Sequence, residues 1–336
     1  STFSLADHYL GEGGASEASS HPPQTVAAVP AMMAAAAVTE TIKIGCRVFC
    51  CDYHQPFVLV KEMATLDLLS DGRLEAGFGA GWVTAEYEAM GVPMDRPGVR
   101  IDRMVEYVEF ARQFFAGGDL DYQGEHVRVG NTTALPEPAQ PGGPKFMIGG
   151  GSPRVLGLAG KLADIVSINF DNSAGKIGER GMGSGTLEGT TNKIDWIRKG
   201  AGDRFADLEL EIGAYFTVVT DNTEQTTAAM AKMFGMTPEV LSQHPHTHNG
   251  SVDQISETHR DRRALGADAH DHRPAGQAVL ARELGQGPAF LARQAHHLRH
   301  HRHHDPVDPV PVHPLDLARE DLLVDGVVVA ERCLED

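Results

Sequence analysis

Short apolar runs of strand length recur along the chain, and a helical pattern follows almost every one of them. In the second helix, apolar residues at positions 57, 60, 64 and 68 fall on one face, and Pro56 suits the first turn. Strands that alternate with helices in this way imply a parallel sheet. Six runs are expected as its strands: residues 2–5, 42–49, 74–78, 145–148, 164–168 and 208–219. Residues 121–129 alternate as a small hairpin insertion would.

Polar and glycine-rich residues follow directly after five of these strands. They are Asp7 with His8, residues 50–54, residues 79–82, residues 149–152, and Asn169. In a (β/α)8 barrel the loops after the strands converge at one face and form the active site. A doubly wound sheet also binds ligands at strand ends, but mainly at one switch point. Five such strand ends therefore favour an α/β fold of the (β/α)8 TIM-type barrel class.

The segment IGGGSPRVLGLAG, residues 148–160, places Gly149, Gly150 and Gly151 between a strand and a helix. Ser152 is the expected N-cap of that helix. Main-chain N–H groups and the positive end of a helix dipole together form a site for phosphate that needs no basic side chain. The segment therefore predicts an anion site, with a plain tight turn as the alternative.

The stretch LEAGFGAGW, residues 74–82, carries glycines at positions 77, 79 and 81. It matches a dinucleotide fingerprint only weakly, because Trp82 stands where the last glycine of G-x-G-x-x-G is required. One interpretation is that the main chain of Gly79, Ala80 and Gly81 lets a flat ring or a phosphate tail approach, with Trp82 as a wall. The alternative is that the glycines relieve crowding inside the barrel and that Trp82 belongs to the core.

Two histidines are candidates for proton exchange near neutral pH. His8 follows Asp7 at the end of the first strand, where it could exchange protons or form a hydrogen bond to a ring. A single histidine is more often structural, and only its position among the other loops favours a role for His8. His54 has the weaker case, because His-Gln-Pro is also typical of the start of a helix.

Composition excludes several classes of partner. The net charge of -17 and the lack of a basic stripe argue against nucleic acid. The longest apolar run, residues 26–38, is too short to cross a bilayer and contains Pro30, so no membrane partner is expected. Four cysteines without metal or redox spacing, and no leader at the start STFSLADHY, indicate a cytoplasmic protein with reduced thiols.

Several segments together resemble the luciferase-like flavin-fold oxidoreductases, most closely their F420-dependent (deazaflavin) branch. The segments are ADHYL (6–10), the block from TIKIGCRVFCCDYHQPF to YEAMGV (41–92), RPGVRIDRM (96–104), YQGEHVRV (122–129) and IGGGSPRVLGLAGKLADIVSINF (148–170). The similarity extends from residue 1 to about residues 251–258. It implies a (β/α)8 barrel that binds coenzyme F420, or alternatively FMN, at the carboxyl ends of the strands.

The resemblance also implies roles for particular residues. Asp7 and His8 match a catalytic Asp-His pair near the ring edge. A non-proline cis peptide that backs the ring is expected at Arg47–Val48, or as the second choice at Cys46–Arg47. The remaining cofactor-binding residues implied by the match are Gly79, Ala80, Gly81 and Trp82 in one loop, and Gly149, Gly150, Gly151 and Ser152 in the phosphate-binding turn.

The activity implied is an F420-dependent hydride transfer between the reduced deazaflavin and a small organic substrate, with a proton from His8. With FMN the chain would instead be a luciferase-like monooxygenase whose dry pocket protects a reactive oxygen adduct. A catalytically inactive cofactor-binding barrel or a defective gene product is a third hypothesis. The substrate is not identified, since variable loops at residues 11–24 and 172–191 build its pocket. The resemblance allows a homodimer.

The composition changes at residue 259. Residues 259–336 contain no Lys, Ile, Met, Asn, Ser, Thr, Tyr or Trp, although all occur earlier. This vocabulary is typical of a GC-rich coding sequence translated out of frame, so we hypothesise a frameshift near residue 258; a disordered His/Arg/Pro-rich tail is the alternative. The tract HHLRHHRHH, residues 296–304, would hold metal only weakly, so no metal site is expected. The domains are thus 1–258, an N-terminally truncated barrel, and 259–336.

The resemblance also bears on barrel closure. The family's first strand would precede residue 1, and its eighth would follow residues 251–258. The first and eighth strands are neighbours in a closed barrel, so both losses open one gap with two unpaired edges. We therefore expect an incomplete barrel, in which the segment DGVVVAERC, residues 325–333, fills part of the gap.

Overall fold

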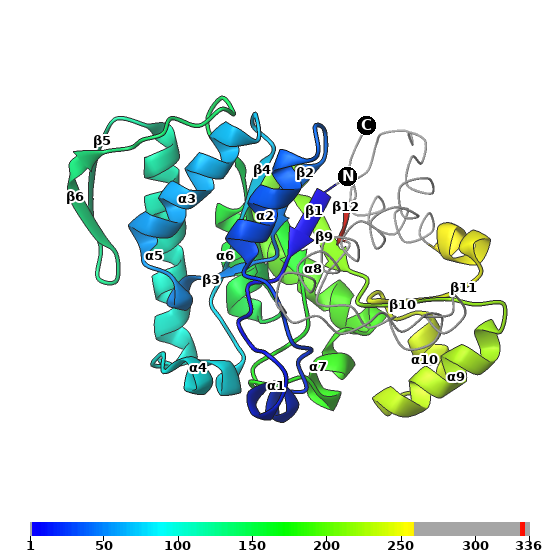
Figure 1. Cartoon of the computed structure of the whole chain (residues 1–336). Coiled ribbons are helices and arrows are strands. Elements are labelled where there is room, and N and C mark those ends of the chain that lie inside the picture. The colour runs from blue at the N-terminus through cyan, green and yellow to red at the C-terminus, as the bar shows by residue number, and fades with distance from the viewer. Residues whose placement is uncertain (1, 259–329, 333–336) are drawn as a thin grey trace, which may run out of the picture. The chain divides into compact units, whose positions relative to one another are not determined.

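The computed structural model describes residues 2–258 and 330–332. Its main sheet runs in the order β1-β2-β4-β7-β8-β9-β12, with β3 paired to β4, and the neighbouring strands from β1 to β9 are parallel (Figure 1). The strands of this sheet are β1 (Thr2–Leu5), β2 (Lys43–Cys46), β3 (Phe49–Cys50), β4 (Leu74–Gly79), β7 (Lys145–Gly150), β8 (Ile165–Ile168), β9 (Glu209–Gly213) and β12 (Ala330–Arg332).

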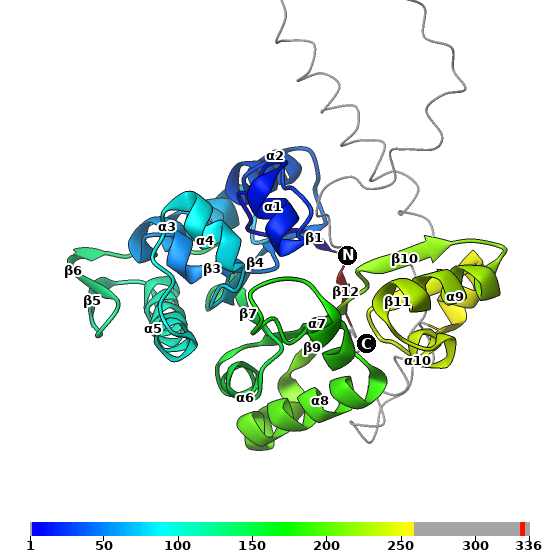
Figure 2. The same cartoon turned by 90° about the horizontal axis from the view of Figure 1, so that it is seen from below.

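Helices follow the strands as the alternating pattern predicts, and Figure 2 shows α2, α3, α5, α6 and α8 on the outside of the curled sheet. The helices are α1 (Gly14–Ser19), α2 (Ala28–Ala37), α3 (Pro56–Leu69), α4 (Thr84–Met90), α5 (Pro97–Ala116), α6 (Pro153–Leu162), α7 (Glu179–Ser184), α8 (Leu187–Ala201), α9 (Thr223–Phe234) and α10 (Pro238–Ser242), with short 3-10 turns η1 (Cys51–Tyr53) and η2 (Gly202–Asp207). The fold is thus of the α/β TIM-barrel class, as the sequence predicts.

Two predicted strands are divided in the structure, and the sequence-based bounds were wrong there. Residues 42–49 form β2 and the start of β3, with Arg47 and Val48 between the two strands. Residues 208–219 form β9, which stays in the main sheet, and β10 (Phe216–Val219), which leaves it and pairs in parallel with β11 (Thr247–Gly250). Val219 of β10 is 65% exposed, so its apolar side chain does not mark a core strand.

The predicted hairpin is confirmed, with strands β5 (Asp119–Gln123) and β6 (Arg128–Thr133) paired antiparallel. In the described part of the chain the main sheet ends at β1 on one side and at β12 on the other. Residues 330–332 pair antiparallel with β9, so the segment expected to fill part of the barrel gap does join that edge. Residues 252–258 are helical. The strand expected after them, and the rest of the 259–336 tail with its histidine tract, lie outside the described residues.

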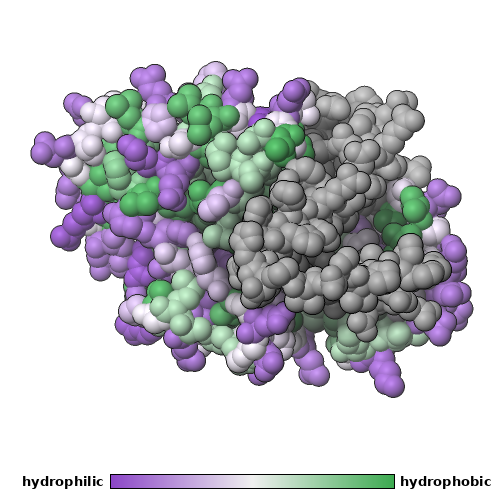
Figure 3. All heavy atoms as spheres, in the orientation of Figure 1, coloured by the Kyte–Doolittle hydropathy of each residue, from purple (hydrophilic) through white to green (hydrophobic). Residues whose placement is uncertain are grey.

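The core lies between the sheet and its outer helices. Phe78 of β4 and Phe146 of β7 are fully buried, with ring centroids 5.2 Å apart, and Phe110 of α5 is also fully buried. On the face drawn in Figure 3 apolar and polar side chains are interspersed, and α3 exposes Leu68 and Leu69. This packing fixes the helices against the strands and leaves the carboxyl ends of the strands to form a site.

Candidate active site at the strand ends

The main chain becomes accessible where the strands end. All residues of β4 are buried, whereas Ala80, Gly81 and Trp82 directly after it are partly exposed. Arg47 is also partly exposed, although its side chain is only 2% exposed, so the accessible part of Arg47 is its main chain. Gly149 and Gly150 at the end of β7 show the same partial exposure. At the carboxyl ends of neighbouring strands, the sheet therefore presents main chain rather than large side chains.

The peptide bond between Arg47 and Val48 is cis, which confirms the first of the two positions expected for it. Among the described residues the second choice, Cys46–Arg47, is not cis. The bond lies between β2 and β3, directly at the carboxyl end of the strand. The segment that the resemblance singles out is thus at the predicted edge of the sheet.

Glycines of LEAGFGAGW make room for this cis segment. A Cβ atom on Gly79 would lie 2.4 Å from Cγ2 of Val48, and one on Gly77 would lie 2.1 Å from the carbonyl oxygen of Cys46. Gly149 on the neighbouring strand also borders Val48, at 3.2 Å. The side chain of Val48 therefore fills the space that these glycines leave empty. At Gly77 and Gly79 the structure supports relief of crowding; whether a ring contacts Gly79 stays a prediction.

Gly81 is required for a different reason. Its φ angle is +69°, in the left-handed region that favours glycine, and a Cβ atom there would lie 1.9 Å from the hydroxyl of Tyr87. The buried guanidinium of Arg100 donates hydrogen bonds to the carbonyl oxygens of Ala80 (3.1 Å) and Gly81 (2.7 Å). Arg100 thus holds the loop after β4 in one conformation, while Ala80, Gly81 and Trp82 stay partly exposed.

His8 is bound to a glutamate that the sequence analysis did not single out. Nδ1 of His8 lies 2.7 Å from Oε2 of Glu86, and Oε1 of Glu86 accepts a hydrogen bond of 2.6 Å from the main-chain N–H of Tyr9. The hydroxyl of Tyr53 donates a third hydrogen bond, of 3.1 Å. Burial acts to raise the pKa of Glu86, but the hydrogen bonds from His8, Tyr9 and Tyr53 outweigh it and lower that pKa. A buried, charged glutamate therefore orients His8.

A second histidine and a tryptophan stand beside His8. The ring centroids of His8 and His21 are 3.9 Å apart, and that of Trp82 lies 6.0 Å from His8 and 5.8 Å from His21. Burial and the neighbouring His8 lower the pKa of His21 to about 4, so His21 is neutral near pH 7. Trp82 is partly exposed, as a wall of the site would be. No sequence signal pointed to His21, because it belongs to a loop of no recognisable pattern.

Asp7 has a different position from His8. Its Oδ2 atom accepts hydrogen bonds from the main-chain N–H of Cys50 (2.9 Å) and from Nε2 of His54 (2.8 Å). The side chain is fully buried, and the carbonyl oxygen of His54 in turn accepts from Tyr107. Asp7 therefore ties the end of β1 to the segment after β3. His54 belongs to this tie rather than to the accessible edge.

The turn after β7 is tightly packed. A Cβ atom on Gly150 would lie 2.4 Å from Cγ1 of Val155, and one on Gly151 would lie 1.9 Å from the carbonyl oxygen of Phe170. Ser152 is the N-cap of α6, as predicted, and its hydroxyl accepts a hydrogen bond of 3.5 Å from the N–H of Val155. These contacts account for the glycines as a close-packed turn, and phosphate binding there stays a prediction.

The inside of the curled sheet holds an ion pair that the sequence did not predict. The guanidinium of Arg47 contacts the carboxylate of Glu211 on β9 through Nε, and its Nη2 donates a 2.6 Å hydrogen bond to Oγ of Ser167 on β8. Side-chain burial is nearly complete, with Arg47 2% and Glu211 1% exposed. Burial raises the pKa of Glu211, and Arg47 opposes that rise. Arg47, predicted as a cofactor residue, thus sends its side chain into the sheet interior.

Burial keeps three thiols near the site in their protonated form. Cys46, Cys50 and Cys51 are free and buried, and burial raises the pKa of each, that of Cys50 to about 12. Among residues 2–258 no cluster of three metal-ligating side chains occurs. In the same part of the chain, no helix is long and apolar enough to cross a membrane.

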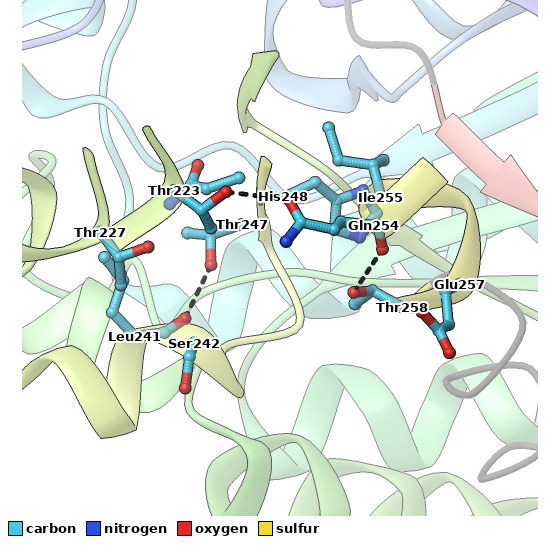
Figure 4. A pocket seen from close by; sticks show the side chains of 11 residues that line it. Thr223, Thr227, Leu241, Ser242, Thr247, His248, Gln254, Ile255, Glu257 and Thr258 are labelled. Atoms are coloured by element: carbon cyan, nitrogen blue, oxygen red, sulfur yellow. Dashed lines mark hydrogen bonds between the residues drawn. The ribbon is translucent and has the colours of Figure 1, made fainter. Parts of the chain in front are cut away.

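A cavity of about 320 Å3 lies elsewhere, among α9, α10, β11 and the helix at residues 252–258 (Figure 4). Its lining is rich in hydroxyl and amide groups: Thr223, Thr227, Leu241, Ser242, Thr247, His248, Asn249, Gln254, Ile255, Glu257 and Thr258. None of these belongs to the strand ends described above. Chemistry rather than cavity size therefore places the candidate active site at the edge that carries His8 and the cis peptide.

A curled parallel sheet, with polar groups and accessible main chain gathered at the carboxyl ends of its strands, defines a protein of the TIM-barrel class. Residues 1–297 match the family model described as luciferase-like monooxygenase. The chain belongs to this luciferase-like monooxygenase family. The matched range extends past residues 251–258, where the sequence similarity was expected to end.

Known relatives include enzymes of both cofactor types. The chain is 25% identical over 238 residues to the 5,10-methylenetetrahydromethanopterin reductase of Methanopyrus kandleri, covering 66% of this chain and 64% of the relative. It is 24% identical over 189 residues to the FMNH2-dependent dimethylsulfone monooxygenase of Pseudomonas fluorescens, covering 56% and 47%. An uncharacterised protein of Mycobacterium tuberculosis is 37% identical over 131 residues, covering 39% and 45%. The chain thus spans less than two thirds of the length of these relatives.

Solved structures agree with the fold. The coenzyme F420-dependent tetrahydromethanopterin reductase of Methanopyrus kandleri superimposes with a TM-score of 0.58 at 16% identity, covering 79% of this chain and 91% of that one. The monooxygenase RslO1 of Streptomyces bottropensis gives 0.57 at 20% identity, covering 78% and 77%. At these identities the likeness supports the fold alone.

Proposed function

We propose that the chain is an F420-dependent oxidoreductase that exchanges a hydride between the deazaflavin and a small organic substrate. The observation that carries the proposal is the joint position, at the carboxyl ends of neighbouring strands, of His8 with its Glu86 partner and of the partly exposed main chain at Arg47 and at Ala80–Gly81. Family membership supports a redox cofactor of the flavin or deazaflavin type, since relatives named for each type occur. Preference for F420 over FMN rests on the resemblance of the sequence motifs.

The residues fit a planar ring bound against main chain. Gly79 leaves room for Val48 and Gly81 leaves room for Tyr87, so the strand ends pack closely without side chains of their own. The partly exposed main chain at Ala80, Gly81, Gly149 and Gly150 would then meet the polar edge of a flavin or deazaflavin. Trp82 would close one side and the turn at Gly149–Gly151 with Ser152 would hold the phosphate tail at the start of α6.

When bound, reduced deazaflavin supplies a hydride, whereas reduced FMN supplies electrons to O2. The proposed role of His8 is to hold and move a proton. Its Nδ1 atom is committed to Glu86, so Nε2 is the ring nitrogen left for a substrate. Glu86 acts through His8 by fixing the orientation of its ring. Asp7 is a positioning residue, because its carboxylate binds the main-chain N–H of Cys50.

Separate titrations of F420 and FMN into the purified full chain, followed by the cofactor's absorbance, test the proposal. Saturable binding of F420, with FMN weaker by about tenfold or more, supports it. Preference for FMN, with NADH-coupled O2 consumption, would instead make the chain a luciferase-like monooxygenase. Absence of binding by either cofactor contradicts both functions.

The third hypothesis, an inactive cofactor-binding barrel or a defective gene product, makes its own prediction. It expects tight F420 binding without turnover across a broad panel of acceptors. Replacement of Gly79 by Ala should weaken cofactor binding if the ring contacts the carboxyl end of β4, while Gly183→Ala on the exposed side of α7 is the matched control.

A homodimer and a cytoplasmic location stay predictions. Helix α3 exposes Leu68 and Leu69, which would be available to a second copy of the chain.

A further inference from the structure

Two buried nitrogen atoms inside the curled sheet have no hydrogen-bond partner within the described part of the chain. They are Nη1 of Arg47 and Nε2 of His246. The Arg47 side chain is 2% exposed, and His246 is fully buried. A buried polar group without a partner is costly, so native proteins rarely leave two of them together. Such a pair indicates a place that a ligand group completes.

The side chains that carry these atoms both border Gly213, at the end of β9. A Cβ atom on Gly213 would lie 2.9 Å from Nη1 of Arg47. The carbonyl oxygen of Gly213 is 2.7 Å from Nδ1 of His246. Gly213 is therefore bordered by the guanidinium of Arg47, by the ring of Tyr215, whose Cζ would lie 2.8 Å from such a Cβ atom, and, at its carbonyl oxygen, by the imidazole of His246.

The two nitrogens have opposite hydrogen-bonding character. A carbonyl oxygen only accepts, so Nδ1 of His246 carries the hydrogen toward Gly213. Burial lowers the pKa of His246 to about 3, which keeps the ring neutral and leaves a bare lone pair on Nε2. Nη1 of Arg47 can only donate. A ligand group that satisfies both must accept one hydrogen bond and donate another.

Aromatic rings pack against His246. The ring centroid of His246 lies 4.2 Å from that of Phe170, after β8, and 5.5 Å from that of Tyr215, after β9, with which it is stacked. Phe170 and Tyr215 are only partly buried. A ligand with a flat aromatic body would extend this group of rings and would bring its own polar group toward the two nitrogens.

We propose that Arg47 Nη1 and His246 Nε2 form a subsite that binds a hydroxyl group carried by an aromatic or similarly flat substrate. The hydroxyl oxygen accepts from Arg47, and the hydroxyl hydrogen is donated to His246. A carboxylate fits less well, because it satisfies Arg47 only and faces both the lone pair of His246 and the carboxylate of Glu211. The proposal rests on the proposed function, since it names the substrate class of the same strand-end site.

Binding of three matched probes to the purified full chain tests the subsite. Phenol offers a donor and an acceptor, whereas anisole and benzoate offer acceptors only. We expect phenol to bind at least about fivefold more tightly than either, as one net hydrogen bond provides, measured by ligand-observed NMR titration. Equal affinity for phenol and anisole, tighter binding of benzoate, or no binding of phenol at millimolar concentration overturns the proposal.

Variants locate the effect. His246→Phe should abolish the preference for phenol over anisole, His246→Gln should retain part of it through its amide oxygen, and His126→Phe on the distant hairpin should leave it unchanged. A preference that persists in a folded His246→Phe protein overturns the assignment. F420 titration of the same samples separates the two ideas: cofactor binding without phenol preference removes only the subsite, whereas phenol preference without cofactor binding removes only the proposed function.

Discussion

Arg47 at the end of β2 forms an ion pair with Glu211 of β9, although three strands, β4, β7 and β8, lie between β2 and β9 in the sheet order. Two side chains can meet across three intervening strands only where the sheet curls enough to bring its inner face together. Ser167 on β8 joins the pair through a hydrogen bond from Arg47. The buried pair is thus a cross-link inside the curl, and it starts from the residue whose peptide bond is cis.

Replacing Arg47 by Met should therefore destabilise the fold strongly. The change leaves the carboxylate of Glu211 buried without its partner, which typically costs about 3–5 kcal/mol of unfolding free energy. Urea unfolding of the full chain measures the loss. The double variant Arg47→Met with Glu211→Met removes both charges, so most of the lost unfolding free energy should be recovered. A double variant as unstable as Arg47→Met would show that the packing of the Arg47 side chain, rather than its charge, stabilises the fold.

The same variant should show a pH dependence of defined sign. Burial raises the pKa of Glu211 in the folded state, and without Arg47 it rises further. The folded protein then binds a proton that the unfolded chain has already released, so the unfolding free energy falls as the pH rises above the carboxyl's ordinary value. Arg47→Met should consequently lose less stability at pH 5 than at pH 8. An equal loss at both pH values would contradict a buried, uncompensated Glu211.

Gly79→Ala should destabilise the fold by roughly 1–3 kcal/mol through overpacking, since the new methyl group would lie 2.4 Å from Cγ2 of Val48. Val48→Ala removes that atom, so the double variant should be more stable than Gly79→Ala alone. Gly77→Ala is different, because its methyl group would lie 2.1 Å from the carbonyl oxygen of Cys46 and only secondarily, at 3.1 Å, near Cγ1 of Val48, so Val48→Ala should rescue it much less. Thermal unfolding of the parent, the three single variants and the two double variants tests this. Rescue of both glycine variants to the same degree would be inconsistent with the geometry.

Gly183→Ala is the control for the glycine series. Gly183 lies exposed in α7 and has no positive φ angle, and an added Cβ atom would meet nothing within 4 Å. Alanine favours a helix over glycine by about 1 kcal/mol. The control should therefore be as stable as the parent or slightly more stable.

Much of the frame was predictable from sequence, because it depends on local pattern. The second predicted helix does begin at Pro56, since apolar periodicity and a proline suited to the first turn are both local signals. The six parallel strands followed from alternation with helices, and Ser152 was predicted as an N-cap from its place after three glycines. The cis bond at Arg47–Val48 followed from the resemblance rather than from the residues themselves.

The partners of the site residues were not predictable, because they depend on distances across the fold. Glu86 is 78 positions from His8, and nothing in its helix distinguishes it from Glu88 until the structure shows Glu86 buried and Glu88 exposed. Arg47 and Glu211 belong to strands whose meeting requires the curl. For the same reason residues 208–219 were predicted as one strand: the turn away at Tyr215 depends on β11, a distant partner.

Glu86→Gln should weaken His8 as a proton-exchanging group while leaving the site assembled. Glutamine keeps the size of the side chain and can still accept from the N–H of Tyr9, but it removes the negative charge beside the imidazole. Under the proposed function we expect turnover to fall by about tenfold to a hundredfold, with F420 affinity changed by less than about threefold. Stopped-flow cofactor oxidation and an F420 titration provide the two readouts. An equal fall in both would assign Glu86 to the integrity of the cofactor site instead.

His21 should make the stability of the protein fall on mild acidification. Burial, with a smaller effect of His8, lowers its folded-state pKa to about 4, whereas the unfolded side chain titrates near 6.5. Between these values the unfolded chain takes up a proton that the folded protein refuses, so the unfolding free energy decreases as the pH falls, by roughly 1–2 kcal/mol between pH 7 and pH 5. His21→Phe retains a ring beside Trp82 and should remove this part of the pH dependence, whereas His126→Phe should not. Urea unfolding of the parent, His21→Phe and His126→Phe at pH 7 and pH 5 measures the difference. Parallel pH profiles for His21→Phe and the parent would mean that folded His21 takes up the proton as readily as the unfolded side chain does. The ring of His8, with its centroid 3.9 Å from that of His21, argues against such protonation.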